Sequence, residues 1–399
     1  WFHEFPSFTR VLIVGAGETG LALARPFRHW DTDTPYVVIG FVDDDPTRRG
    51  LYVEGVPILG TTEDIPRLAE ARHVDLIAVA VHHMPGPAFR ELLGRCQQTR
   101  ARIKVVPDMV SLMDANGRAP LLRDVRAEDL LGRKTIGRHE AVDFSPVTGR
   151  VVLVTGAAGS IGAELSRQLL DYDPVRLLLL DNNESGLYDL MGELRARQPD
   201  APLVPILADV TIKEAIEKVF TQHEPEVVFH VAAYKHVPML ELFPGEAVRV
   251  NIGGTWLVAE MARLYHAERF VLISSDKAVN PSSVMGLTKR IDELLMRALT
   301  RQNGRQTRFT AVRFGNVLGS RGSVVPTFTR QIENGGPVTV THPAMTRYFL
   351  SISEAVNLVI HAACLTEGDD LFILEMGEEV RIVDLAERMI RMHGLRPYH

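Results

Sequence analysis

Cysteine is scarce in this sequence, and histidine, although common, shows no metal-binding spacing. The 399 residues include two cysteines, Cys96 and Cys364, which lie far apart in the chain. We therefore expect small buried thiols in a reducing compartment and no disulfide framework. None of the 14 histidines stands in a zinc-type spacing such as HExxH, so we predict no metal site.

Long apolar runs and basic clusters are absent as well. No stretch reaches the roughly 18 consecutive apolar residues that a membrane-spanning helix needs. The formal net charge is −6, and no cluster of lysine or arginine alternates with aromatic residues, which argues against nucleic acid as a partner. The chain begins at Trp1 and carries no signal-peptide pattern. We interpret this start as a cut within a longer polypeptide.

The sequence does contain one pattern twice, which is an apolar strand, a glycine-rich turn and a helix. The first copy runs through 10–14 into the turn 15–20, and the second through 151–155 into the turn 156–162. An apolar, β-branched run that stops at glycines and resumes with helical periodicity is typical of a parallel strand feeding a helix. The chain length also favours two domains.

These patterns predict an α/β chain of two Rossmann-like doubly wound domains in tandem. The domains are expected at 1–145 and 146–399, the second with a small C-terminal substrate-binding lobe mainly from residue 316. In the first domain we expect strands at 10–14, 36–43, 74–81 and 103–106, a first helix interrupted by Pro26, and a connector with a short helix at 116–149. In the second we expect strands at 151–155, 177–181, 203–208, 227–232, 270–275 and 309–314, and helices at 184–197, 212–222 and 283–301.

A glycine turn after a first strand lets a pyrophosphate approach the backbone and the following helix, although such a turn alone is a weak signal. In the second domain, Asp181 closes the next strand 19 residues after Gly162, where a carboxylate would take both hydroxyls of the adenosine ribose. A carboxylate at this position favours NAD over NADP as the cofactor. The alternative is that Asp181 is an ordinary turn residue beside Asn182. In the first domain Asp43 stands similarly, and dinucleotide binding and a purely structural or regulatory module stay equally open there.

Candidate catalytic residues follow the fifth strand of the second domain. Ser275, Asp276 and Lys277 stand at its end, and Met285 and Lys289 share one face of the next helix. A lysine there can hold the nicotinamide ribose, and an acid beside a base can donate and accept protons at one point. An ordinary surface ion pair is the alternative for Asp276 and Lys277.

The second domain resembles the extended short-chain dehydrogenases, and among them the bacterial nucleotide-sugar 4,6-dehydratases of the polysaccharide-biosynthesis (capsule, O-antigen and N-glycan) group. The matching stretches are TGAAGSIG at 155–162, DNNE at 181–184, HVAAYKHVP at 230–238, SSDKAVNP at 274–281, VMGLTKR at 284–290, VRFGNVLGSRGSVVP at 312–326 and MTRYF at 345–349. The first domain resembles the amino-terminal cytosolic module of that group through GFVDDDP at 40–46 and GVPILG at 55–60.

The resemblance implies UDP-N-acetylglucosamine as substrate and NAD as a tightly held cofactor. NAD would oxidise C4, Lys277 would remove the C5 hydrogen, Asp276 would protonate the leaving C6 hydroxyl, and the hydride would return to C6, giving a 4-keto-6-deoxy sugar for surface polysaccharide or glycan synthesis. The implied cofactor contacts are Gly156, Gly159, Ser160, Ile161, Gly162, Asp181, Asn182, Asn183, Asp209, Val210, Ala232, Ala233 and Lys289. The implied substrate contacts are Lys235, Asn316, Arg321, Val324, Thr341 and Arg347. For His236, simple loop packing is an equal alternative, and Asn251 is interpreted as structural support.

Met285 departs from the Tyr-x-x-x-Lys motif of the wider superfamily, but it resembles the long, membrane-anchored branch of the dehydratases. A thioether cannot take the C4 hydroxyl proton, so Ser275, a water or Lys289 must do so. A nucleotide-sugar 4-epimerase and a non-catalytic dinucleotide sensor are the alternative functions. The resemblance also implies a homo-oligomer at the cytoplasmic face of the bacterial inner membrane, anchored by transmembrane helices that precede this sequence.

Overall fold

The computed structural model describes residues 8–27, 36–81, 84, 86–106, 122–124, 142–302, 306–320 and 322–398. Arg321 and most of the expected connector at 116–149 lie outside these residues. The chain divides into two compact units. The first takes its residues from 1–134, 324–346 and 380–399, and the second from 135–323 and 347–379. The division into two functional domains at residue 145 stays a prediction.

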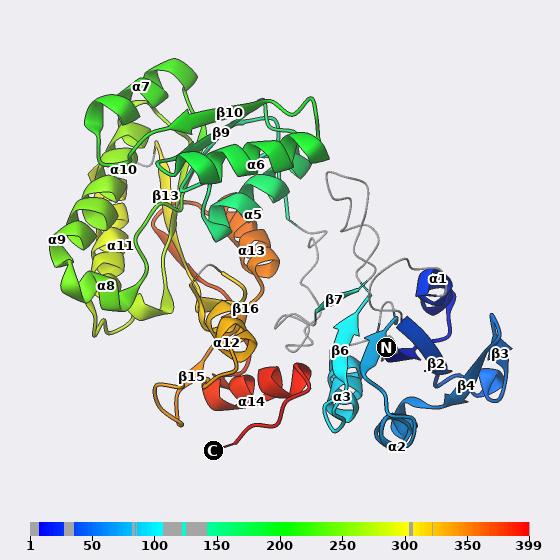
Figure 1. The fold of residues 1–399 in the computed structure, drawn as a ribbon. Coiled ribbons are helices and arrows are strands. Elements are labelled where there is room, and N and C mark those ends of the chain that lie inside the picture. The colour runs from blue at the N-terminus through cyan, green and yellow to red at the C-terminus, as the bar shows by residue number, and fades with distance from the viewer. Residues whose placement is uncertain are drawn as a thin grey trace, which may run out of the picture. The chain divides into compact units, whose positions relative to one another are not determined.

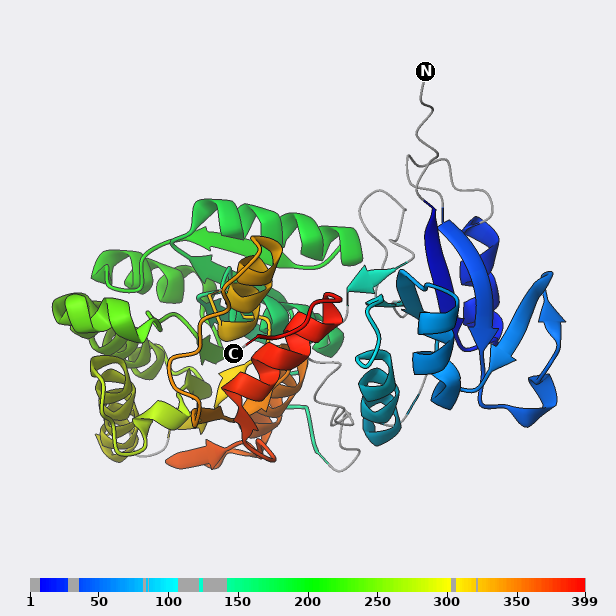
Figure 2. The ribbon, with the colours of Figure 1, turned by 60° about the horizontal axis from the view of Figure 1, so that its bottom comes forward.

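The first unit is built on a seven-stranded sheet of order β3-β4-β2-β1-β5-β6-β7 (Figure 2). The strands are β1 (Thr9–Val14), β2 (Tyr36–Val42), β3 (Tyr52–Val53), β4 (Val56–Gly60), β5 (Leu76–Val79), β6 (Arg102–Val105) and β7 (Arg123–Asp124). β1, β2, β4, β5 and β6 are parallel to one another, and β3 and β7 pair antiparallel at the two edges. The expected strands β1, β2, β5 and β6 are confirmed within a few residues, whereas β3, β4 and β7 were not predicted.

The first unit also contains helices, the first of which packs on this sheet through apolar side chains. They are α1 (Glu18–Phe27), η1 (Pro46–Arg48), η2 (Thr62–Asp64), α2 (Ile65–Ala71) and α3 (Gly86–Cys96), with α12 (Val324–Glu333) and α14 (Ile382–Met392) from the C-terminal part. Leu23 and Phe27 of α1 belong to the same buried cluster as Val11, Ile13 and Phe41 of the strands. The expectation that Pro26 interrupts α1 was wrong, because Pro26 lies in the last turn of a helix that continues to Phe27.

The second unit contains a fully parallel seven-stranded sheet of order β10-β9-β8-β11-β12-β13-β17. Its strands are β8 (Val151–Thr155), β9 (Arg176–Asp181), β10 (Leu203–Leu207), β11 (Val227–His230), β12 (Arg269–Ile273), β13 (Arg308–Arg313) and β17 (Asp370–Ile373). The six expected strands are confirmed within a few residues. β17 was not predicted; it lies at the edge of the sheet, and none of its residues is fully buried.

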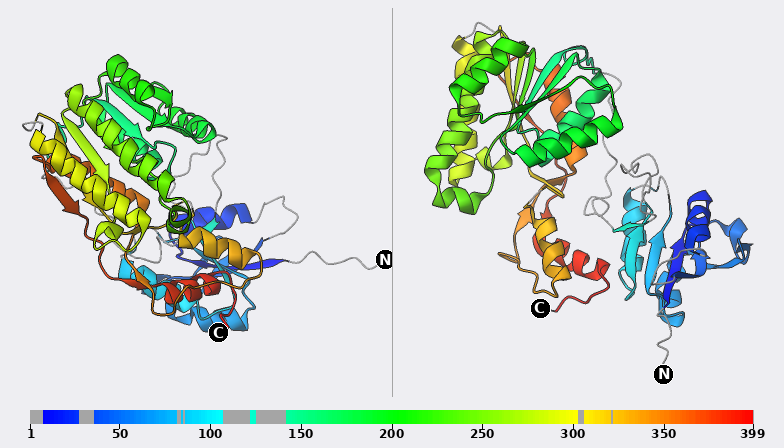
Figure 3. Two further views of the ribbon diagram at one scale, coloured as in Figure 1. Left: turned by 90° about the vertical axis from the view of Figure 1, so that its left-hand side faces the viewer. Right: turned by 45° about the horizontal axis from the view of Figure 1, so that its top comes forward.

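Helices cover both faces of this sheet and produce two apolar layers (Figures 1 and 3). They are α5 (Ser160–Leu169), η4 (Leu170–Tyr172), α6 (Glu184–Arg197), α7 (Lys213–His223), α8 (Val237–Leu242), α9 (Pro244–Ala247), η5 (Val248–Gly254), α10 (Thr255–Leu264), η6 (Asp276–Ala278), α11 (Val284–Gln302) and α13 (Ile352–Leu365). Val152 and Val154 pack with α5, α6 and α13, while Val151 and Leu153 pack with α7, α10 and α11. A strand buried on both faces must be apolar throughout, which explains the unbroken runs in the sequence.

The short elements β14 (Asn316–Val317), β15 (Thr346–Arg347), β16 (Phe349–Leu350) and β18 (Val380–Arg381) complete the chain, and β14 pairs with β16. The strand order of the second unit reverses at β8, which lies between β9 and β11. In open parallel sheets, ligands bind beyond the carboxyl ends of the strands at such a reversal. None of the described helices is long and apolar enough to cross a membrane.

Candidate functional site

The glycine turn after β8 is shaped for close approach of another chain or a ligand. Gly156 has φ +68°, and a Cβ atom there would lie 2.7 Å from the backbone nitrogen of Ala232. A Cβ at Gly162 would overlap the carbonyl of Gly156. Gly159 is the N-cap residue of α5, which begins at Ser160. Only glycines permit this turn, and it leaves a helix N-terminus facing the carboxyl edge of the sheet.

Two acidic residues flank this turn where the adenosine half of a dinucleotide would lie. Asp181 accepts hydrogen bonds from the backbone nitrogens of Ala158 and Asn183, each at 2.9 Å. Asp209 accepts from the backbone nitrogen and the hydroxyl of Thr211, both at 2.8 Å. Burial pushes the pKa of Asp209 upward, but the hydrogen bonds from Thr211 outweigh it and the pKa lies below its usual value. Both carboxyls are thus held in place, and they fit an NAD site with two ribose hydroxyls.

Buried polar side chains connect β8, the strand that leads into the glycine turn, with its neighbours. The ring of His230 is fully buried and contacts the hydroxyls of Thr155 and Thr255 at 2.9 and 3.0 Å. Burial, together with the positive charge of Lys289, lowers the pKa of His230 to about 3. A neutral histidine therefore links β8, β11 and α10, and it is a structural group and not a proton carrier.

The acid–base pair expected at the end of β12 is formed. The Lys277 ammonium donates to Oδ1 of Asp276 and to Oδ1 of Asn316, both at 3.0 Å, and the Ser275 hydroxyl donates to the same Asp276 oxygen at 2.9 Å. A Cβ at Gly286 would overlap the carbonyl of Lys277, so this glycine lets α11 approach the turn that carries the pair. The pair is about one-third exposed, with side-chain values of 32% for Lys277 and 26% for Asp276, and so a substrate can reach it.

Met285 and Lys289, which stand at the two positions of the Tyr-x-x-x-Lys motif, both lie on α11 but have different surroundings. The Met285 side chain is buried in an apolar cluster with Leu240 and Ala247. Lys289 is 7% exposed, and its nearest acidic partner is Asp292, whose Oδ2 lies 3.8 Å from the ammonium nitrogen. Burial lowers the pKa of Lys289. Met285 thus packs as an apolar residue, while Lys289 carries an amino group in a nearly dry environment.

Asn251 fixes the loop after β11. It lies in the π-helix η5, accepts from the Tyr234 backbone nitrogen at 2.8 Å, and donates to the Tyr234 carbonyl and to the hydroxyl of Thr288 at 3.1 and 3.0 Å. Lys235 is exposed in that loop. The ring of His236 lies against Gly322, where a Cβ would come within 2.6 Å of it. These contacts agree with a supporting role for Asn251, which stays a prediction. For His236, whose side chain is exposed, loop packing and a contact with the nicotinamide or the sugar both stay open.

The remaining expected contacts are spread over the chain. Ala232 and Ala233 are half-buried at the end of β11, and Asn183 caps α6 by accepting from Gly186. Val210 packs against Gly254, since a Cβ atom on Gly254 would lie 2.8 Å from the Val210 side chain. Asn316 and Arg347 belong to the second unit, and Val324 and Thr341 to the first, so their common role in binding substrate stays a prediction. Arg321 is outside the described residues.

Sequence reasoning missed a buried ionic network beneath the acid–base pair. Glu293 accepts from the Ser274 hydroxyl at 2.7 Å and from two guanidinium nitrogens of Arg313 at 2.6 Å each, and Arg290 donates to it at 3.0 Å. The position of Glu293, one helical turn after Lys289, could be read from the sequence, but the burial of its side chain could not. Asp292 was missed for the same reason.

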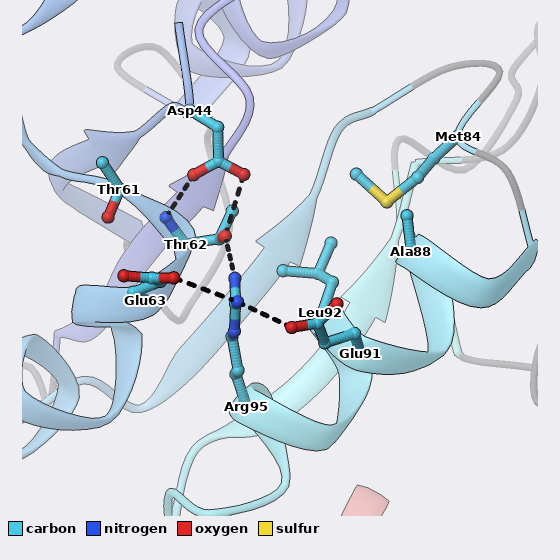
Figure 4. A pocket seen from close by; sticks show the side chains of 9 residues that line it. All are labelled: Asp44, Thr61, Thr62, Glu63, Met84, Ala88, Glu91, Leu92 and Arg95. Carbon is cyan, nitrogen blue, oxygen red and sulfur yellow. Dashed lines mark hydrogen bonds and ion pairs between the residues drawn. The ribbon is translucent and has the colours of Figure 1, made fainter. Parts of the chain in front are cut away.

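The first unit has its own glycine turn and a cavity beside it. Asp43 accepts from the backbone nitrogens of Ala16 and Asp45 at 2.7 and 2.9 Å, and Arg48 donates to it at 3.1 Å. A cavity of about 380 Å³ lies at the ends of β2 and β4 beside α3. Figure 4 shows Arg95 paired with Glu91 of the same helix, α3, and with Glu63 of η2. The lining residues of the cavity are Asp44, Thr61, Thr62, Glu63, Met84, Ala88, Glu91, Leu92 and Arg95.

Comparison with known proteins identifies relatives of both units. Residues 152–399 match the family described as polysaccharide biosynthesis protein, and residues 7–107 match the family described as CoA-binding domain. The probable polysaccharide biosynthesis protein EpsC of Bacillus subtilis is 43% identical over 387 residues, 97% of this chain and 64% of that protein. Among solved structures, Pen from Bacillus thuringiensis is 33% identical with a TM-score of 0.58, over 61% of this chain and 74% of that chain.

Relatives with a named reaction fall into two classes. The UDP-N-acetylglucosamine 4,6-dehydratase (inverting) of Campylobacter jejuni is 32% identical over 250 residues, 62% of this chain and 71% of the enzyme. The UDP-glucose 4-epimerase of Rickettsia canadensis is also 32% identical, over 229 residues, 56% of this chain and 65% of the enzyme. Overall similarity therefore does not separate the two reactions, and the site residues must do so.

Proposed function

We propose that this chain, which belongs to the polysaccharide biosynthesis protein family of extended short-chain dehydrogenases, is a UDP-N-acetylglucosamine 4,6-dehydratase. The observation that carries the proposal is the pair of Asp276 and Lys277 at the end of β12, with Lys277 also bound to Asn316 at 3.0 Å. An acid and a base at one point are what elimination of water across two neighbouring carbons needs.

The turn of Gly156 and the carboxyl of Asp181 would hold NAD, which when bound would supply the oxidation at C4 of the sugar and the reduction at C6. The fit rests on the positive φ of Gly156 and on the fixed carboxyl of Asp181. A carboxylate at that position repels a 2′-phosphate, which favours NAD over NADP. The proposed further contacts are the cofactor and substrate residues named from the sequence.

The acid–base pair performs the elimination. Lys277 removes the proton from C5, which a ketone at C4 acidifies, and Asp276 gives a proton to the C6 hydroxyl so that it leaves as water. The ion pair must first become neutral: the Lys277 ammonium passes a proton to the Asp276 carboxylate, which leaves Lys277 with a free lone pair and Asp276 with the proton that the C6 hydroxyl receives. When hydride reaches C6, Lys277 returns the C5 proton. Asn316 holds the lysine amine on one side, which orients its remaining lone pair after proton loss.

A 4-epimerase is the alternative reaction, and two residues argue against it. Epimerases of this superfamily use a tyrosine at the position of Met285, whose side chain here is buried with Leu240 and Ala247. An epimerase also has no use for a base at C5, where Lys277 is proposed to act. A non-catalytic sensor would have no need for the buried Lys289 or for the Asp276–Lys277 pair.

Incubation with UDP-N-acetylglucosamine, followed by mass spectrometry, tests the proposal. A product lighter by one water supports the dehydratase. Interconversion with the galacto sugar, without loss of water, would replace it by the epimerase. Neither activity, in a protein extended to the full length of its relatives, would favour the sensor; the extension matters because this chain spans 64% of the length of EpsC. Assembly into a homo-oligomer and anchoring at the cytoplasmic face of the inner membrane stay predictions.

We also propose that the first unit binds an adenine nucleotide of the coenzyme A type. Support comes from the carboxyl of Asp43 on its glycine turn, the cavity beside Thr62 and Arg95, and the family match of residues 7–107. Arg48, held at 3.1 Å from Asp43, would meet a ribose phosphate. Calorimetric titration with coenzyme A and with NAD tests this. Binding of neither by a protein whose first unit is folded would leave the structural module as the better account.

A further inference from the structure

Asp292 is a buried carboxylate without a hydrogen-bond donor. It lies on α11 with 0% of its surface exposed, and neither carboxylate oxygen has a hydrogen-bond partner among the described residues. Buried polar groups almost always find such a partner, and an exception calls for an explanation. Its nearest cation is the Lys289 ammonium at 3.8 Å, which is beyond hydrogen-bond distance.

Lys289 is the residue through which Asp292 can influence the reaction. The proposed dehydratase must remove a proton from the C4 hydroxyl, and Met285 offers no oxygen for it. The Ser275 hydroxyl already donates to Asp276 at 2.9 Å. Lys289 can accept the proton only if its amino group passes one on, because an ammonium has no free lone pair. The adjacent acceptor is Asp292.

We propose that Asp292 acts through Lys289 as the terminal acceptor of the C4 hydroxyl proton. This inference rests on the proposed dehydratase function. The C4 hydroxyl gives its proton to Nζ of Lys289 as the C4 ketone forms, and Nζ gives one of its protons to Oδ2 of Asp292. Asp292 later returns that proton through Lys289 to solvent, and Asp276 takes up from solvent the proton that it gave to the leaving hydroxyl, so the protein ends the cycle as it began. Closing the gap requires a movement of Nζ of about 1 Å, which a flexible lysine side chain allows.

The surroundings of Lys289 and Asp292 favour uptake of a proton by the Asp292 carboxylate. Burial raises the pKa of Asp292 to about 7, opposed by Lys289 and reinforced by Glu293. Glu293, on the same helix, is engaged by Arg313 of β13 and Ser274 of β12. His230 of β11 is neutral at these pH values, and the buried residues of α10 are apolar apart from Thr255. No charged group among these neighbours competes with Asp292 for the proton of Lys289.

Infrared spectroscopy of the NAD-loaded protein without substrate tests the pair independently of turnover. We expect a protonated-carboxyl band that titrates near neutral pH and is missing in Asp292→Asn. A wild-type protein without that band overturns the inference. If the band is present but no keto sugar forms, the proton pair stands and the dehydratase function fails, so the two outcomes are distinguishable.

Turnover gives the second readout. Asp292→Asn should slow loss of water on the order of 10²-fold or more and remove the fall in rate on the acid side of neutral pH, while NAD still binds. Asp292→Glu, which keeps the carboxyl, should restore part of the rate and the pH dependence. The exposed Asp171→Asn, whose ion pair with Arg197 lies on the surface, is the matched control. A folded, NAD-binding Asp292→Asn protein with the wild-type rate and pH profile overturns the inference.

Discussion

The two glycine turns of this chain are built alike, but among the residues that the structure describes, an acid–base pair stands at the strand ends of the second unit and none is seen in the first. Gly15 and Gly156 both have positive φ, at +96° and +68°. The strand-end carboxyls Asp43 and Asp181 each accept one backbone hydrogen bond from the turn, at 2.7 and 2.9 Å. The two units thus share a turn, a carboxyl and five central parallel strands in the same order, and these features alone do not provide a reaction.

The difference lies at the other strand ends. In the second unit, β12 delivers Asp276 and Lys277, and α11 delivers Lys289. In the first unit, Arg48 forms an ion pair with Asp43. The cavity of this unit is lined by Arg95, which pairs with Glu63 and Glu91. Fold and chemistry are thus separable within one chain, which agrees with the general finding that function resides in sites placed on folds.

Removing the proposed base should have the largest effect. Lys277→Ala is expected to lower the rate of water loss on the order of 10²–10⁴-fold, because general-base catalysis at C5 is lost. NAD binding should remain, since the Lys277 ammonium is hydrogen-bonded to Asp276 and Asn316 and not to the glycine turn. Rates are measured by mass spectrometry of the sugar product. Lys218→Ala, an exposed lysine of α7, is the control, and a Lys277→Ala protein as active as this control would refute the role of the base.

The next largest effect contrasts a buried with an exposed ion pair. Glu293→Gln should cost about 3–5 kcal/mol of unfolding free energy, because Arg313 then keeps a buried charge without its partner. The exposed pair of Arg25 and Glu54 in the first unit, at 2.8 Å with 68% and 40% exposed side chains, should give less than about 1 kcal/mol when Glu54→Gln removes it. Denaturant unfolding measures both. Equal losses would mean that the network under the active site does not stabilise the second unit.

Matched glycine substitutions distinguish the two turns. Gly156→Ala should weaken NAD binding about 10- to 100-fold, because its left-handed φ and the Ala232 backbone at 2.7 Å oppose a Cβ. Gly15→Ala meets the carbonyl of Ala80 at 2.9 Å and should strain only the first unit. Calorimetry with NAD compares them. If Gly15→Ala weakened NAD binding and Gly156→Ala did not, the cofactor would belong to the first unit.

The last contrast concerns the dependence of stability on pH. The pKa of His230 is lowered to about 3 by burial, below its unfolded value near 6.5. The unfolded chain therefore binds a proton that the folded unit refuses, so the stability present above pH 6.5 is lost as the pH falls toward 3, by about 1.4 kcal/mol per pH unit. His230→Gln should flatten this slope in thermal unfolding. His342→Gln, an exposed histidine of the first unit, should leave it unchanged, and an unaltered slope in His230→Gln would show that other groups cause it.

Much of the fold could be predicted because its signals are local. The strand Val151–Thr155 and the helix Glu184–Arg197 have the predicted bounds, since one is an uninterrupted apolar run and the other begins at Asn183, which caps it. The strand Asp370–Ile373 was missed because its two faces are unequally exposed at a sheet edge. The π-helix Val248–Gly254 has no sequence pattern that distinguishes it from an α-helix.

The site could be predicted in part. Asp276 and Lys277 are adjacent in the sequence, so their pairing needed only the end of a strand. Asp292 could not be recognised, because its importance depends on complete burial and on the absence of a donor, which tertiary packing decides. The packing of Met285 against Leu240 likewise depends on a helix that is distant in the sequence.

Transfer of a label within the sugar tests the central claim most directly. UDP-N-acetylglucosamine carrying deuterium at C4 is incubated with the NAD-loaded protein in ordinary water, and the product is analysed by mass spectrometry and NMR. The account predicts a 4-keto sugar that has lost one water and carries the deuterium at C6. Deuterium retained at C4 in a sugar that has kept its water, or a keto product without deuterium, would contradict it.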